Sequence, residues 1–199
     1  MVFFNRRRNS STIRRLEYIQ SSGTQYINTG FLPNNNTRLV MSCTISYTSG
    51  STVPILGARD QNSSSGSGSN AFVVFAINDE MRYDYGSQSE TISVNPSQIQ
   101  TIDLNRNVAT FNGQVLNVST QNFTTGRSLA LFTLQQPNGF DTRHASMQLR
   151  SVRIYDDGVM ARDYVPCYDE SDVACLYDRV NRQYVYNAGT GSFIAGPEL

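Results

Sequence analysis

Apolar and polar residues alternate along most of the chain, the pattern of strands that bury one face. In "TRLVMSCTISYT", residues 37–48, every second position is apolar, and the shared face holds Leu39, Met41, Cys43, Ile45 and Tyr47. This alternation predicts a long, half-buried strand. It also gives Cys43 a simple interpretation as a core thiol.

Further short apolar runs follow, separated by clusters of Asn, Gly, Ser and Asp. "VPILGAR", "NAFVVFAIN" and "EMRYDYG" each predict one strand, whereas "QNSSSGSGSN" between the first two predicts a mobile loop. "IQTIDLNRNVATFNGQVLNV" predicts three strands joined by two turns. Asn112-Gly113 is the strongest hairpin signal, because both residues tolerate the positive φ of a type I′ turn. "SLALFTL", residues 128–134, predicts an apolar central strand.

"SMQLRSVRIYDDGVMARDYVP" predicts a second hairpin, which turns at Asp157-Gly158. The apolar residues on its first strand change parity halfway, so a β-bulge near Arg150–Ser151 is needed to keep them on one face. No segment of residues 16–199 has a helical period over 11 or more residues, and no internal repeat of 20–50 residues is found. The pattern therefore predicts one all-β domain over residues 16–199, a sandwich or barrel.

Residues 1–15 differ from this domain, being polar, basic and without apolar periodicity, and we expect a flexible arm. The arm holds Arg6, Arg7, Arg8, Arg14 and Arg15. It carries a charge of +5, whereas residues 16–199 carry −5, although the whole chain is neutral. Such an arm could contact the phosphates of nucleic acid in a salt-sensitive manner. It could equally dock into an acidic groove of a partner protein and become ordered there, or remain a solvated tail.

The remaining bulk features narrow the class of protein. The N-terminal stretch is not a secretory signal, because no apolar run of 7–15 residues follows its charges. No segment approaches the ~18 apolar residues of a membrane span. Three cysteines are too few for a disulfide framework. We therefore expect synthesis in a cytoplasm, buried free thiols and no membrane contact.

The stretch "CYDESDVAC" combines cysteines and acids and is the first candidate for a metal site. Its cysteines, Cys167 and Cys175, are eight residues apart, unlike the closer spacing of zinc motifs. The acids could hold a hard cation, but they lack the pattern of an EF-hand. The sequence favours acids on a solvated turn above packed cysteines, and predicts neither a metal site nor a cofactor.

Catalytic constellations are equally weak. His144 is the single histidine, and it lies in a polar connection without a recognisable partner. Glu80 and Asp84 share one face of a strand, but a charged outer face explains them better than the facing carboxylates of a glycosidase. No phosphate-binding loop is present. Eleven tyrosines and many asparagines permit sugar binding, although tryptophan is absent. We expect a protein that is not an enzyme.

The order of motifs is more specific than any one of them. "LEYIQSSGTQYINTGF", "ILGAR", "RYDYG" and "VRIYDDGVMARDYVPCYDESDVACLYDRVNRQYVYNAGTGSFIAGPE" together resemble the laminin-G-like, concanavalin A-like jelly rolls of surface and phage-encoded proteins of gut bacteria. The resemblance covers residues 16–199. It implies a two-sheet antiparallel jelly-roll sandwich whose last segment is a fold signature, with a final hairpin holding the terminus against the first strand. Cys167 is then a packed thiol, and Cys175 replaces a small or apolar residue.

The resemblance and the arm together lead to a functional hypothesis. We expect a non-enzymatic bacteriophage virion protein, a capsid decoration or fibre protein, assembled in the host cytoplasm. The arm would anchor it to capsid or tail proteins of the same particle, or contact nucleic acid, while the domain forms a homo-oligomer and displays a lectin-like face to host or mucosal glycans. The main alternative is a carbohydrate-binding module of a bacterial cell-surface protein. A capsid-forming jelly roll and a degenerate glycoside hydrolase are further alternatives.

Overall fold

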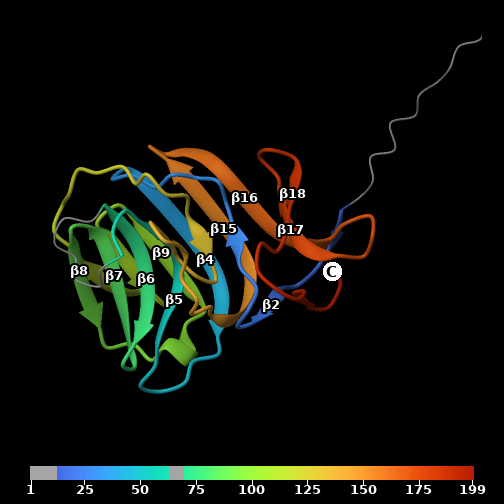
Figure 1. The fold of residues 1–199 in the computed structure, drawn as a ribbon, viewed down its shortest axis with the longest axis horizontal. Coiled ribbons are helices and arrows are strands. Elements are labelled where there is room, and N and C mark those ends of the chain that lie inside the picture. Colours follow the sequence, from blue (N-terminus) through green and yellow to red (C-terminus); the bar gives the residue numbers. More distant parts are fainter. Residues whose placement is uncertain (1–12, 63–69) are drawn as a thin grey trace, which may run out of the picture.

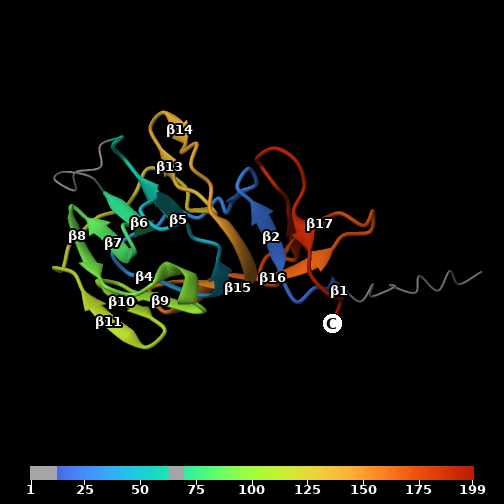
Figure 2. The same ribbon diagram turned by 90° about the horizontal axis from the view of Figure 1, so that it is seen from below.

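The computed structural model describes residues 13–62 and 70–199, which form two β-sheets packed face to face (Figures 1 and 2). The predicted all-β sandwich is thus confirmed. Residues 63–69 of the predicted mobile loop lie outside the described residues. Within the described residues, η1 (Pro96–Gln98) is the only helical element, a single 3-10 turn. No helix there is long and apolar enough to cross a membrane.

The first sheet contains most of the long strands. In spatial order these are β11 (Gln114–Asn117), β10 (Val108–Phe111), β9 (Thr101–Asn105), β4 (Thr37–Ile45), β15 (Ser146–Asp156), β16 (Val159–Tyr168), β17 (Ala174–Asp178) and β18 (Gln183–Val185). Three short strands lie beside this path, namely β1 (Arg14–Arg15) on β16, β2 (Ile19–Ser22) on β15 and β19 (Ile194–Ala195) on β2. All these pairings are antiparallel.

The second sheet lies across the core from the first. Its order is β14 (Gly139–Phe140), β13 (Gln135–Gln136), β5 (Thr52–Arg59), β6 (Ala71–Ile77), β7 (Glu80–Gly86) and β8 (Gln88–Ile92). β12 (Ala130–Leu131) also pairs with β5, and β3 (Ile27–Asn28) pairs with β12. The pairing of β13 with β5 is parallel, and the other pairings are antiparallel.

The core fills the space between the sheets and follows the alternation of the sequence. Leu39 and Met41 of β4 are buried, as predicted, and they belong to the same cluster as Phe72 of β6 and Tyr83 of β7. The rings of Phe72 and Tyr83 meet edge to face at 5.6 Å. Burying each such side chain contributes roughly 1.5–3 kcal/mol.

Both predicted hairpins and the bulge are present. Asn112 and Gly113 have φ values of 49° and 85°, the left-handed conformation that a type I′ turn requires. The turn at Asp157-Gly158 joins β15 to β16. The pairing of β15 with β4 shifts register between Leu149 and Ser151, which restores the buried face where the sequence changes parity.

The segment 128–134 differs from its prediction as a continuous strand. It forms only the two residues of β12, because Phe132 adopts a φ of 71° and turns the chain out of the sheet. Such a conformation is rare for a bulky residue. Surrounding contacts hold it: the Phe132 N–H donates to the Ile55 carbonyl at 2.9 Å, and the Phe132 carbonyl accepts from the Ala145 N–H at 2.6 Å.

The chain termini of the domain lie together, as the resemblance implies. β19 pairs with β2, and Leu16 bridges to Glu198. The boundary of the arm, however, differs from the expected one after residue 15. Arg14 and Arg15 form β1 and extend the first sheet, because their backbones pair with Tyr168 and Cys167 of β16.

Candidate functional site

A polar cavity opens at one end of the first sheet, where three turns meet. Its volume is about 570 Å³, within the range of small-molecule sites. The turns are the segment before β4, the β9–β10 turn and the β15–β16 turn. The cavity is lined by Asn36, Arg38, Asn105, Arg106, Asn107, Val108, Tyr155 and Gly158.

The turn before β4 is built by asparagine side chains. Asn34 accepts a hydrogen bond from the Asn36 N–H at 2.7 Å through its Oδ1, the short-range bond that favours Asn in turns. The Asn34 N–H donates to Thr37 Oγ1 at 2.9 Å, and its Nδ2 donates to Asp156 at the end of β15 at 2.8 Å. These bonds fix Asn36 at the cavity and join this turn to the neighbouring hairpin.

The β9–β10 turn consists of Arg106 and Asn107. Arg106 has a φ of 56°, and its N–H donates to the Thr37 carbonyl at 3.1 Å. Asn107 Nδ2 donates to the Val118 carbonyl at 2.8 Å, which ties the turn to the end of β11. A non-glycine residue with positive φ persists where surrounding contacts impose it, as they do here.

Two tyrosines of the second sheet donate hydrogen bonds to the backbone of these turns from the core side. Tyr83 donates its O–H to the Arg106 carbonyl at 2.8 Å, and Tyr85 donates to the Asn35 carbonyl at 2.7 Å. Both side chains come from β7 and cross the core. Burial raises the pKa of Tyr83 well above its ordinary value and also raises that of Tyr85, so the phenols remain donors at neutral pH.

The two arginines of the cavity have different surroundings. Arg38 binds Asp103 with two hydrogen bonds, of 3.0 and 2.7 Å, and its guanidinium lies 6.0 Å from the centre of the Tyr155 ring. Arg106 lies 3.6 Å from Asp157 with no hydrogen bond, and 56% of its side chain is exposed. A ligand that engages Arg106 therefore competes with a long, solvent-exposed ion pair, and such pairs contribute little.

The lining offers hydrogen-bond donors and acceptors around an aromatic ring. Guanidinium groups and amides supply the polar contacts, and Tyr155 supplies the ring. The lining contains no aspartate, glutamate, histidine or cysteine, so it lacks the usual acid–base and nucleophilic groups. The cavity thus presents hydrogen-bond donors and acceptors beside one aromatic ring.

The residues predicted as the docking arm lie elsewhere. Arg6, Arg7 and Arg8 are outside the described residues. Arg14 forms ion pairs with Asp172 and with Glu198, the latter at 2.6 Å, and its guanidinium lies 4.9 Å from the centre of the Tyr168 ring. Arg15 is exposed on β1. Of the two arm arginines that the structure describes, Arg14 is ion-paired within the domain and Arg15 is exposed.

The acids of "CYDESDVAC" lie in the turn between β16 and β17, and Asp169 stabilises this turn through hydrogen bonds. Asp169 accepts hydrogen bonds from the N–H groups of Ser171 and Val173, each at 2.9 Å, and from the Tyr186 hydroxyl at 3.0 Å. The bond from Val173, above all, lowers the pKa of Asp169. Among residues 13–62 and 70–199, no group of three or more His, Cys, Asp or Glu side chains is placed to hold a metal.

Asp84 corrects one expectation, because it does not lie on a solvated outer face. Only 4% of its surface is exposed, and it pairs with Arg82 at 2.8 Å. Arg59 is buried beside them and donates to Gln136 at 2.7 Å. His144 packs its ring 5.3 Å from that of Tyr26. Glu80, Asp84 and His144 are therefore not among the residues that line the cavity.

The residues that line the cavity were not identified from sequence patterns. Their signals were the asparagines of "NNNT", at 34–37, and of "NRN", at 105–107. Both groups predict turns, but nothing in the sequence indicates that two turns seventy residues apart meet. Only the pairing of β4 with β9 brings them together.

Comparisons with known proteins support the fold and leave the function open. No family model matches the chain, and no curated protein matches its sequence. A solved structure from Bacteroides ovatus, described as a "putative carbohydrate binding protein", is similar with a TM-score of 0.54 and 10% sequence identity. The match covers 94% of this chain and 62% of the other, so the chain spans less than two thirds of that structure. At this identity the likeness shows a shared β-sandwich.

Proposed function

We propose that this chain is a carbohydrate-binding β-sandwich whose ligand occupies the cavity between the β3–β4, β9–β10 and β15–β16 connections. The observation that carries the proposal is the lining itself, in which amides and the exposed Arg106 guanidinium surround one tyrosine ring. The Bacteroides ovatus structure, whose description names carbohydrate binding, supports the same class of ligand. This favours the alternative of a carbohydrate-binding module over the virion hypothesis.

Each group has a role that suits a sugar. The Asn105 amide has no hydrogen-bond partner among the described residues and can bond to ring hydroxyls. The Arg106 guanidinium can donate to vicinal hydroxyls or to a sugar carboxylate. Tyr155 offers an aromatic face for the apolar side of a sugar ring. We further propose binding without hydrolysis, because no carboxylate lines the cavity.

A glycan array followed by calorimetry on the strongest ligand tests this proposal. Arg106→Ala should weaken binding roughly 10–100-fold, the loss of a charged hydrogen bond. Arg15→Ala is the matched control, because Arg15 is also an exposed arginine but lies on β1, away from the cavity. Equal loss in both variants, or binding unaffected by Arg106→Ala and Tyr155→Ala, would place the ligand elsewhere. Release of reducing ends from the ligand would contradict binding without hydrolysis.

The virion role stays a prediction. It depends on an arm whose Arg6, Arg7 and Arg8 lie outside the described residues. Mass spectrometry of purified phage particles tests it: a copy number that fits a lattice position supports decoration of the capsid, and absence from particles contradicts it.

A further inference from the structure

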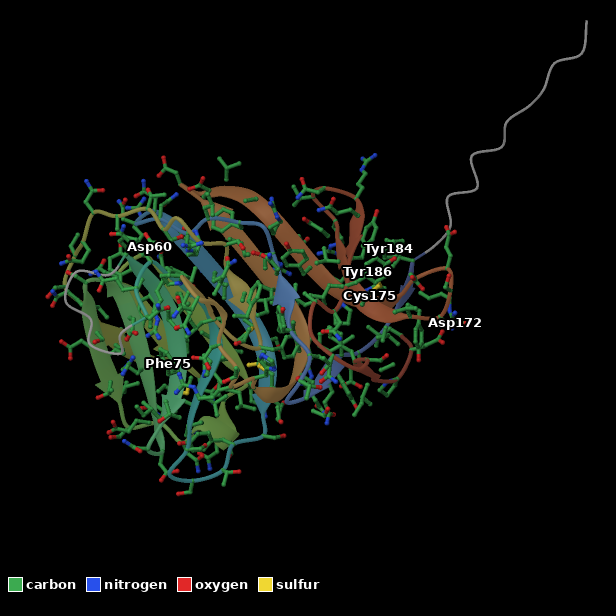
Figure 3. All side chains as sticks on the ribbon, in the orientation of Figure 1. Asp60, Phe75, Asp172, Cys175, Tyr184 and Tyr186 are labelled. Carbon is green, nitrogen blue, oxygen red and sulfur yellow. The ribbon has the colours of Figure 1, made fainter. Side chains whose placement is uncertain are left out.

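The two cysteines of the closing segment face one another. Cys167 of β16 and Cys175 of β17 are directly paired in the sheet, and their Sγ atoms are 3.7 Å apart. Both side chains are fully buried and reduced. Figure 3 shows Cys175 close to Tyr184 and Tyr186, on the part of the molecule that carries β17 and β18.

The register places this pair within reach of a covalent bond. The Pro166 carbonyl accepts from the Leu16 N–H at 2.9 Å and so points towards β1. The next residue, Cys167, therefore directs its backbone towards β17, and its partner Cys175 occupies a hydrogen-bonded position. Cα atoms in such a pair are ~5.5 Å apart, which lies within the range of disulfides.

We propose that Cys167 and Cys175 are the site of a reversible disulfide that closes the β16–β17 hairpin. A small-molecule disulfide is the oxidant. The thiolate of Cys167 attacks one of its sulfurs and releases one thiolate, which gives a mixed disulfide. Cys175, after losing its proton, attacks the Cys167 sulfur and releases the second thiolate. The protein loses two electrons and two protons, and the oxidant becomes two thiols.

The surroundings of the pair assign the roles of the two thiols. When Cys175 is the donor, the hydrogen bond between them lowers the pKa of Cys167 and raises that of Cys175, and in this arrangement Cys167 is the attacking group. Tyr177 and Tyr184 lie on the same face of the sheet as Cys175 and pack against each other at 5.2 Å. β18, which carries Tyr184, has three residues and lies at the end of the strand order, so local opening of this strand gives the oxidant access.

The position also explains why the bond should be reversible. Closing the bond must bring the Sγ atoms from 3.7 Å to ~2.05 Å, and strain left by this movement makes a disulfide easier to reduce. Oxidation would link Cys167 of β16 to Cys175 of β17. This hairpin holds β1, since Cys167 pairs with Arg15 and Asp172, in the β16–β17 turn, binds Arg14. The redox state would thus act on the attachment of β1.

The experiment treats the reduced full chain with oxidised glutathione, then alkylates remaining thiols under denaturing conditions for mass spectrometry. We expect loss of two thiols, a cross-linked peptide containing Cys167 and Cys175, and an alkylated Cys43. Cys43 is the internal control, because it is buried in the sheet-to-sheet core and burial raises its pKa to about 12. Return of all three thiols in excess reduced glutathione is expected.

Two variants keep the outcome decisive. Cys175→Ser should leave a glutathione adduct on Cys167, and Tyr184→Ala should speed formation of the cross-link by uncovering the pair. Three free thiols after treatment of both the natural chain and Tyr184→Ala would overturn the proposal. So would a stable glutathione adduct on the natural chain, or a cross-link that includes Cys43. A bond that resists reduced glutathione in the folded protein would overturn its reversibility.

Discussion

The hydroxyl of Tyr83 lies 2.8 Å from the carbonyl oxygen of Arg106, although the two residues belong to opposite sheets. The contact joins the buried centre of β7 to the turn that forms one wall of the cavity. Tyr85 makes the equivalent contact with Asn35 at the turn before β4. The second sheet thus sets the positions of the cavity turns, without itself lining the cavity.

Tyr83→Phe should therefore affect both stability and binding. The change removes one buried hydrogen bond and leaves the Arg106 carbonyl without its donor, which costs about 1–3 kcal/mol. We expect a lower urea midpoint together with weaker glycan binding, because the turn bearing Arg106 loses its support. Tyr18→Phe is the matched control, since the Tyr18 hydroxyl has no partner within residues 13–62 and 70–199. A stability loss without a change in affinity would show that Tyr83 does not position the turn.

Alkaline pH should destabilise the fold through the same phenols. Burial raises the pKa of Tyr83 above that of an unfolded tyrosine, so the folded chain holds a proton that the unfolded chain releases. The stabilising contribution is complete below about pH 10 and is lost as pH rises towards the folded pKa, with a slope of about 1.4 kcal/mol per pH unit. Urea unfolding at a series of pH values measures the slope, which Tyr83→Phe should reduce. An unchanged slope in the variant would contradict this assignment.

Strand periodicity and turn chemistry predicted most of this fold, because both act over a few neighbouring residues. The alternation in β4, the turn at Asn112-Gly113 and the bulge between Leu149 and Ser151 are all local signals. Phe132 was not predictable in this way, since its positive φ is imposed by Ile55 and Ala145 from distant segments. The cavity is non-local for the same reason, as its walls come from three separate turns.

The expected end of the arm after residue 15 and the expected exposure of Asp84 differ from the structure for a related reason. Polar composition placed Arg14 in a flexible arm. In the structure its backbone pairs with Tyr168, and its guanidinium binds the acids of two distant segments. Composition also predicted that Asp84 is exposed, whereas Arg82 compensates its burial. Burial of a paired charge depends on a partner and a cover that a local pattern does not reveal.

Two glycines should respond differently to alanine. Gly113 has a φ of 85°, and a Cβ would meet nothing within 4 Å, so Gly113→Ala should cost about 1 kcal/mol through backbone conformation alone. A Cβ on Gly189 would lie 2.2 Å from the Thr24 carbonyl oxygen, so Gly189→Ala must displace the closing segment from the first strands. We expect a much larger loss of thermal stability for Gly189→Ala. Equal losses in calorimetry would contradict the distinction.

The state of Arg14 bears directly on the predicted docking arm. Because Asp172 and Glu198 already bind its guanidinium, Arg14 contributes to a partner contact only after both pairs break. Arg14→Ala should thus speed hydrogen exchange at residues 14–16, 198 and 199, while any binding to particles or DNA changes little.

Replacing Arg6, Arg7 and Arg8 together by serine should have the opposite effects. Hydrogen exchange in the sheet should not change, whereas partner binding at low salt should fall strongly. Pull-down on purified particles and salt-dependent DNA titration measure the second effect. A binding loss with Arg14→Ala as large as with the triple replacement would mean that β1 itself is released on docking. In that case the boundary expected from composition, after residue 15, would describe the bound state.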